Sequence, residues 1–125
     1  MITEDRVTFE IAKLLRDKGF EQDTVSYPYY TDNGNLFTGD VNTPTQRYYN
    51  AASAPTLQMV LKWLREVHGI FIEITCCVND KYDFYVGVYI KGNECWDRCN
   101  YYPEGFETFE EACNTGIEYT LENLI

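Results

Sequence analysis

The hydrophobic period of the chain changes at Gly69, and this change constrains the fold more than any other feature of the sequence. Before it, residues 55–67 carry apolar side chains at the three- and four-residue spacing of an amphipathic helix. After it, residues 70–78 form a β-branched, partly alternating run that is typical of a strand. Gly69 suits the position after a helix C-terminus, where the backbone often turns left-handed. The sequence therefore predicts a helix followed at once by a strand.

Two further segments have the spacing of amphipathic helices. The first covers residues 4–18, with Thr3 as its predicted N-cap and Gly19 after its end. The second begins at Thr108, which with Glu111 forms a capping-box sequence that satisfies two backbone amides reciprocally. The buried side of this last helix is predicted at Phe109, Cys113, Ile117, Leu121 and Leu124.

The strands predicted from the sequence are antiparallel. Residues 26–38 suit a hairpin around the turn Asp32-Asn33-Gly34, and residues 82–91 return from the strand at 70–78. The segment 95–102 forms either a third strand or a loop. In the returning strand, Phe84, Val86, Val88 and Ile90 share one face, and Tyr85 and Tyr89 share the other.

These elements predict one α+β domain over residues 1–125. Their order is α-β-β-α-β-β-(β)-α, and we expect three helices packed on a small antiparallel sheet.

The composition excludes several classes of partner. The chain carries 20 Asp and Glu against 10 Lys and Arg, a net charge of −10. Because Lys and Arg drive binding to nucleic-acid phosphates and to anionic membranes, we expect no direct nucleic-acid partner and no membrane partner. No apolar run approaches the roughly 18 residues of a bilayer span. The acidic N-terminus lacks the hydrophobic region of a signal peptide, which predicts a cytoplasmic protein.

The five cysteines predict reduced thiols, because an odd number without an export signal does not suit a disulfide framework. Cys76 and Cys77 lie in an apolar strand and Cys113 lies on an apolar helix face, so we expect all three to pack as small hydrophobic side chains.

Cys95 and Cys99 leave three interpretations open. They could contribute to a zinc site with Cys76, Cys77 or His68, form a local disulfide on oxidation, or lie in a loop. Structural zinc usually needs two such cysteine pairs, and this chain has one. The sequence therefore predicts no metal ion and no other cofactor.

Catalytic residues are not predicted either. His68 is the only histidine, and a pair with Cys76 or Cys77 would have to cross roughly 20 Å of extended chain. No phosphate-binding glycine loop is present. The sequence favours a protein without enzymatic activity but leaves open an unrecognised cysteine or carboxylate site.

Eleven tyrosines are the most unusual feature of the composition. Tyrosines in irregular segments either seal the edges of a small core or present rigid amphipathic surface to a partner. On the second interpretation, the predicted interaction residues are Tyr29, Tyr30, Tyr48, Tyr49, Tyr101 and Tyr102.

The last helix carries an acidic stripe, which we define as Glu107, Glu111, Glu118 and Glu122. Such a stripe is ordinarily a solvated helix face. It could also bind a basic protein or imitate the charge of nucleic-acid phosphates.

Three segments of the chain resemble a group of small uncharacterised proteins of gut Bacteroides, their mobile elements and their crAss-like phages. They are residues 6–15 with Lys18-Gly19-Phe20, residues 54–56 leading to 62–66, and residues 110–112 leading to 121–125. This resemblance implies an intracellular protein associated with a phage or mobile element. It assigns no activity and no residue roles.

The function predicted from the sequence is a non-enzymatic module that binds another protein or a second copy of itself. The alternative is an inhibitor that imitates nucleic acid at a host DNA-binding enzyme, and an enzyme is the third hypothesis.

Overall fold

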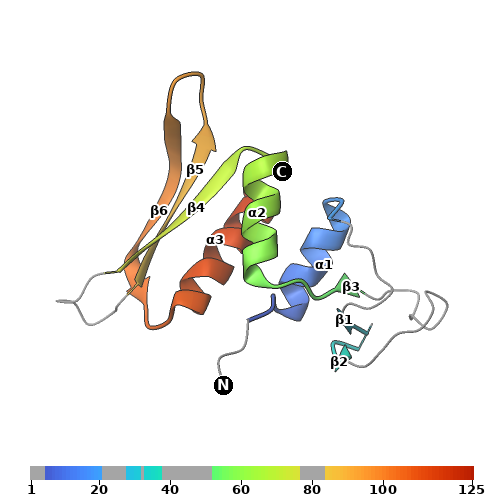
Figure 1. The fold of residues 1–125 in the computed structure, drawn as a ribbon. Helices are drawn as coiled ribbons and strands as arrows, with labels where there is room; N and C mark the ends of the chain where they lie inside the picture. The colour runs from blue at the N-terminus through green and yellow to red at the C-terminus, as the bar shows by residue number, and fades with distance from the viewer. Residues whose placement is uncertain (1–4, 21–27, 32, 38–51, 77–83) are drawn as a thin grey trace. The chain divides into compact units, whose positions relative to one another are not determined.

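The structure is a computed structural model that describes residues 5–20, 28–31, 33–37, 52–76 and 84–125 (Figure 1). These residues form three helices and two three-stranded antiparallel sheets, so the predicted α+β class is confirmed. The strands divide between two sheets, whereas the sequence suggested one. The chain also divides into two compact units, Met1–Thr56 and Leu57–Ile125, and each is described by itself.

The first unit contains helix α1 (Phe9–Asp17) and three two-residue strands. These are β1 (Tyr29–Tyr30), β2 (Leu36–Phe37) and β3 (Ala52–Ser53), in the sheet order β2-β1-β3. The pairing of β1 with β2 confirms the predicted hairpin. The third strand, β3, was not predicted.

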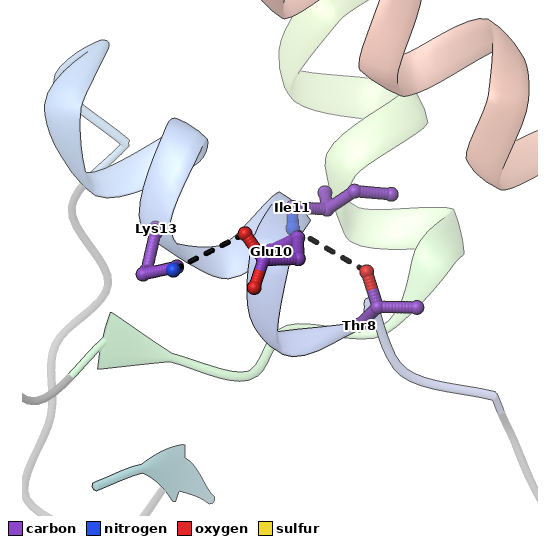
Figure 2. A network of polar contacts seen from close by, with 4 residues as sticks. All are labelled: Thr8, Glu10, Ile11 and Lys13. Carbon is purple, nitrogen blue, oxygen red and sulfur yellow. Dashed lines mark hydrogen bonds and ion pairs between the residues drawn. The ribbon is translucent and has the colours of Figure 1, made fainter. Parts of the chain in front are cut away.

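Helix α1 begins with a side-chain cap. The Thr8 hydroxyl oxygen accepts a hydrogen bond from the backbone N–H of Ile11 at 3.3 Å (Figure 2). The Lys13 ammonium lies 3.1 Å from a carboxylate oxygen of Glu10, which is in the first turn, and the two residues share one helix face.

The predicted N-cap at Thr3 was therefore wrong by five residues. Arg6 forms an isolated β-bridge with Thr56, and the N–H of Val7 donates to the carbonyl of Pro55 at 3.1 Å. Pairing with a segment nearly fifty residues away holds this backbone extended, and helix α1 can start only after it.

The second unit contains two helices and one sheet. The helices are α2 (Leu57–Val67) and α3 (Phe109–Asn123), and the strands are β4 (Ile70–Cys76), β5 (Phe84–Lys91) and β6 (Trp96–Phe106). The strands pair antiparallel in the order β4-β5-β6. The segment 95–102, which the sequence predicted as either a strand or a loop, is therefore part of a strand, β6.

The ends of these helices follow the predicted signals. Gly69 has a φ of 64° between α2 and β4, the left-handed conformation expected there. The hydroxyl oxygen of Thr108 accepts from the N–H of Glu111 at 3.1 Å and caps α3. Helix α2 begins at Leu57, two residues after the predicted start.

Helices α2 and α3 cover one face of the sheet β4-β5-β6 (Figure 1). A methyl group built on Gly116 of α3 would lie 2.8 Å from the Ile72 side chain and 2.9 Å from that of Val86. Helix α3 can approach the strands this closely because Gly116 has no side chain. The buried residues of this core are Leu57, Val60, Leu64, Ile70, Ile72, Val86, Val88, Ala112, Cys113, Ile117, Thr120 and Leu121.

Among the described residues, no helix has the length and apolar character needed to cross a membrane.

Candidate interaction surface

The second face of the sheet β4-β5-β6 carries a cluster of aromatic side chains. Successive residues of a strand point to opposite faces, so the neighbours of the buried residues Ile72, Val86 and Val88 point away from the helices. The register places these neighbours side by side across the three strands. We call this surface the open face, and it comprises Phe71, Glu73, Thr75, Tyr85, Gly87, Tyr89, Lys91, Trp96, Arg98 and Tyr101.

The exposed rings of the open face are not scattered but in contact. Phe71 and Trp96 have ring centroids 5.8 Å apart, and the rings of Tyr85 and Tyr101 are 6.4 Å apart and nearly parallel at 9°. Phe71, Trp96 and Tyr101 are 37%, 39% and 43% exposed, so large parts of these rings meet water. An antiparallel sheet with one packed face usually places polar side chains on the other.

Gly87 lies at the centre of the open face and joins the two aromatic pairs. A methyl group built on it would lie 3.2 Å from the Tyr89 ring and 3.7 Å from the Tyr101 ring. Both rings therefore lean over Gly87 and bury it. The result is a continuous aromatic surface from Trp96 to Tyr85.

A groove of about 370 Å³ runs along the β4 side of this surface. It is lined by Arg65 of α2, Phe71 and Glu73 of β4, Tyr89 of β5 and Trp96 of β6. Such a groove, walled by aromatic rings and bordered by an arginine and a carboxylate, has the composition of a protein-binding surface.

Each of the three strands places a charged residue on the open face. Glu73 is exposed on β4, where its carboxylate accepts a hydrogen bond from the Thr75 hydroxyl at 3.2 Å. Arg98 is exposed on β6, where its guanidinium lies 5.4 Å from the centre of the Tyr101 ring. Lys91, the last residue of β5, is exposed and pairs with Trp96, so it lies on the same face as Tyr89. The open face therefore carries one acidic residue on β4 and two basic residues, one on β5 and one on β6.

The predicted pair Tyr101 and Tyr102 is divided between the two faces of the sheet. Tyr101 lies on the open face, and Tyr102 lies on the helix side, where its ring contacts Tyr119 of α3. Burial raises the pKa of Tyr102, and Tyr119, Glu104 and Glu118 add smaller contributions in the same direction. Only Tyr101 is therefore available to a partner on the open face.

The predicted tyrosines of the first unit serve its packing. Tyr29 is 2% exposed and its ring contacts Phe37, so its assignment as a surface interaction residue was wrong. Tyr30 is half-buried, with its ring 5.5 Å from that of Phe9 and its hydroxyl donating to the Val7 carbonyl at 2.5 Å. Its pKa is raised by burial and lowered to a smaller extent by Arg6. Tyr48 and Tyr49 lie outside the described residues.

All four glutamates of the acidic stripe are exposed. Helix α3 contains no Lys or Arg, and within the described residues none of the four carboxylates forms an ion pair. Three of these glutamates lie on α3, and Glu107 comes just before its N-cap.

The cysteines depart in part from the predicted packing. Cys113 is fully buried in α3 as expected, and burial, assisted by Glu110, raises its pKa to about 12. Cys76 was predicted to be buried and is exposed, because β4 extends past the helices at this end of the strand. Cys77 lies outside the described residues.

Cys95 and Cys99 are both exposed with free thiols. The Cys95 thiol lies 3.8 Å from a side-chain oxygen of Asp97, and the Cys99 thiol lies 3.9 Å from its backbone carbonyl. Across the part of the chain that the structure describes, no three His, Cys, Asp or Glu side chains are grouped to hold a metal ion.

His68 is partly exposed and packs against an aromatic neighbour. Its ring lies edge-on to Trp63 at 4.6 Å, and its Nε2 atom is buried without a hydrogen-bond partner among the described residues. Cys76 lies at the far end of the seven-residue strand β4, about 20 Å along an extended chain. His68 and Cys76 therefore do not form a catalytic pair.

Sequence reasoning missed Phe71 and Trp96 as surface residues. Alternation along 70–78 contained the signal for Phe71, since it follows the core residue Ile70. No signal in the sequence identified Trp96. It lies in the segment 95–102, which was predicted as either a strand or a loop, and without a definite strand its side chain cannot be assigned to a face.

Comparisons of the chain with protein-family models, with curated proteins and with solved structures gave no match.

Proposed function

We propose that this chain is a non-enzymatic protein-interaction module and that the open face is its binding surface. One observation carries the proposal: a sheet whose other face is covered by two helices leaves an unbroken row of aromatic rings in water. Contiguous exposed apolar surface of this kind marks interaction sites in proteins, whereas apolar residues exposed singly do not.

The residue types of the open face support this function. Tryptophan, tyrosine and arginine are the residues that most often dominate the free energy of protein binding. Trp96, Tyr101 and Arg98 lie within one strand, β6, and Phe71 extends the surface onto β4. A partner that covers these rings removes apolar area from water, at about 25 cal/mol for each Å².

The cellular setting remains part of the proposal. The net charge of −10 argues against nucleic acid and anionic membranes as partners. The family resemblance favours an intracellular protein that originates in a phage or mobile element.

The direct test is affinity capture from a host lysate treated with nuclease, combined with a measurement of self-association. A W96A/Y101A double variant removes two exposed rings, and a K62E variant changes an exposed residue of α2 as a control. We expect the double variant to lose both forms of association and the control to retain them. Association that is unchanged in the double variant would contradict the proposal.

The acidic stripe supports a second candidate function, an inhibitor that imitates nucleic-acid charge. The observation in its favour is that α3 carries three of these exposed glutamates, with the fourth just before its N-cap, and has no Lys or Arg of its own. Such a surface attracts the phosphate-binding site of a DNA-binding enzyme through long-range electrostatics.

A variant of the acidic stripe distinguishes the two candidate functions. Changing Glu107, Glu111, Glu118 and Glu122 to glutamine removes four charges and leaves the open face intact. A mimic then loses its ability to displace DNA from its target enzyme, whereas a module that binds through the open face keeps its partner.

A further inference from the structure

We infer that an extended segment of a partner protein pairs with the outer edge of β4 as a fourth strand and places alternate side chains in two grooves beside it. The inference rests on the proposed function, since one of these grooves belongs to the open face. It follows from the backbone groups of β4, from the contrast between the two edges of the sheet, and from the residues that line the grooves.

Strand β4 lies at an edge of the sheet, so half of its backbone groups point away from β5. The N–H of Lys91 donates to the carbonyl of Gly69 at 2.8 Å, and the register of β4 and β5 places these two residues directly opposite each other. Hydrogen-bonded and non-hydrogen-bonded pairs alternate along an antiparallel ladder. The N–H and C=O groups of Ile72 and Ile74 therefore point outward, where no strand of the described residues pairs with them.

The two edges of this sheet differ in their protection against a further strand. Natural edge strands usually carry a proline, a bulge or charged side chains that prevent another chain from pairing. The edge strand β6 contains Pro103, and its register with β5 shifts twice. Strand β4 contains no proline, its register with β5 is continuous over seven residues, and Glu73 is its one charged residue. The edge of β4 therefore keeps the regular backbone that an added strand needs.

A groove borders β4 on each side of the sheet. The groove on the open face includes Phe71 and Glu73 of β4. On the helix side, a second groove of about 240 Å³ is lined in part by Leu61 and Arg65 of α2, Ile72 and Ile74 of β4, and Phe109 of α3. Because successive side chains of a strand point to opposite faces, a strand added beside β4 projects its side chains alternately toward the two grooves.

The lining of the grooves determines the chemistry of the partner segment. Leu61, Ile72 and Phe109 favour apolar side chains on the helix side. Arg65 lines both grooves, is exposed, and forms no ion pair within the described residues, so it favours an aspartate or glutamate of the segment. The segment is therefore extended, with apolar residues at alternate positions and an acidic residue beside Arg65. In this mode of recognition, main-chain hydrogen bonds supply affinity and the side-chain pockets supply specificity.

The test uses a library of random linear heptapeptides displayed on phage and selected on the full chain. Two variants at one position of β4 then separate the backbone from the side chain. Both I74P and I74A remove the isoleucine side chain, but only I74P removes the outward N–H, and neither removes a hydrogen bond to β5. A selected peptide should bind I74P about tenfold more weakly than I74A, because one of its carbonyl groups loses its donor.

A scan of N-methyl groups along the selected peptide tests the same geometry on the unchanged protein. Each methyl group removes one N–H of the peptide, and only alternate N–H groups of an added strand point toward β4. The loss of affinity should therefore recur at every second residue. This measurement decides the question even if I74P does not fold.

Charge reversal on α2 tests the acidic position of the segment. R65E and K62E each replace an exposed cation with glutamate, so they change the net charge of the chain equally. Only R65E should weaken the binding of the selected peptide, by about tenfold, because Lys62 lines neither groove. Equal effects of the two variants would contradict a carboxylate at Arg65.

Three results would overturn the added strand: a selection that enriches no peptide, equal binding to I74P and I74A, or an N-methyl scan without the two-residue period. Capture of a partner by the W96A/Y101A variant shows whether the proposed function fails as well. If W96A/Y101A loses a partner that I74P retains, the open face remains the binding surface and only the added strand is wrong. If both variants retain it, both proposals are wrong.

Discussion

Cys113 and Cys76 show how two cysteines of one chain acquire different chemistry from their surroundings. Cys113 lies against the sheet in α3, where burial raises its pKa to about 12 from an ordinary value of 9.0. Cys76, Cys95 and Cys99 are exposed. Because the thiolate is the reactive form, Cys113 is the least reactive of these four thiols.

This difference predicts the result of thiol labelling. At pH 8 without denaturant, iodoacetamide should label Cys76, Cys95 and Cys99 within minutes, and Cys113 only on the timescale of unfolding. Peptide mass spectrometry measures the four rates. Labelling of Cys113 at the rate of Cys95 would contradict its placement in the core.

The raised pKa of Cys113 also predicts how stability depends on pH. The unfolded chain releases this proton from about pH 9.0 upward, whereas the native chain keeps it to about pH 12, so unfolding is favoured as pH rises through this window. The contribution of the neutral thiol is fully present below pH 9 and is lost above it. Urea unfolding at pH 8 and pH 10 measures the loss, which should be smaller in C113V than in the wild type. Equal losses in both proteins would contradict this account.

At the scale of elements, the sequence predicted all three helices because each has an apolar face with a period near 3.6. Errors occurred where distant pairing overrides local pattern. The bridge between Arg6 and Thr56 delays the start of α1, and no local pattern could have indicated it. For strand β6, the sequence did not decide between a strand and a loop. The register of β6 with β5 shifts twice, and these shifts break the alternation that marks a strand.

The packing of α3 on the sheet predicts the effect of G116A. Alanine favours a helix interior over glycine by about 1 kcal/mol, but the added methyl group would lie 2.8–2.9 Å from Ile72 and Val86. Overpacking of this kind costs about 1–3 kcal/mol, so we expect net destabilisation of up to about 2 kcal/mol. Urea unfolding tests this, with the exposed position E118A as the control. A G116A variant more stable than the wild type would show that α3 lies further from the strands.

At the scale of the whole molecule, the sequence predicted that the protein binds a partner protein, but it did not predict the open face as the binding surface. Tyr101 was selected and lies on the open face, whereas Tyr29 was selected and is buried. Alternation alone assigns residues to two faces of a strand, but which face the helices cover depends on contacts between α2, α3 and the sheet. Phe71 and Trp96 became surface candidates only when those contacts were known.

The accessibility of Trp96 tests the central claim that the open face is a surface that another chain covers. The chain has two tryptophans, so a W63F variant leaves Trp96 as the only one, and acrylamide quenching of its fluorescence reports exposure. In the free chain Trp96 should be readily quenched, consistent with its 39% exposure. When a captured partner protein or a second copy binds, quenching should fall severalfold and the emission should shift to shorter wavelength. If a complex forms while Trp96 stays equally quenched, the open face is not where the partner binds, and the account is contradicted.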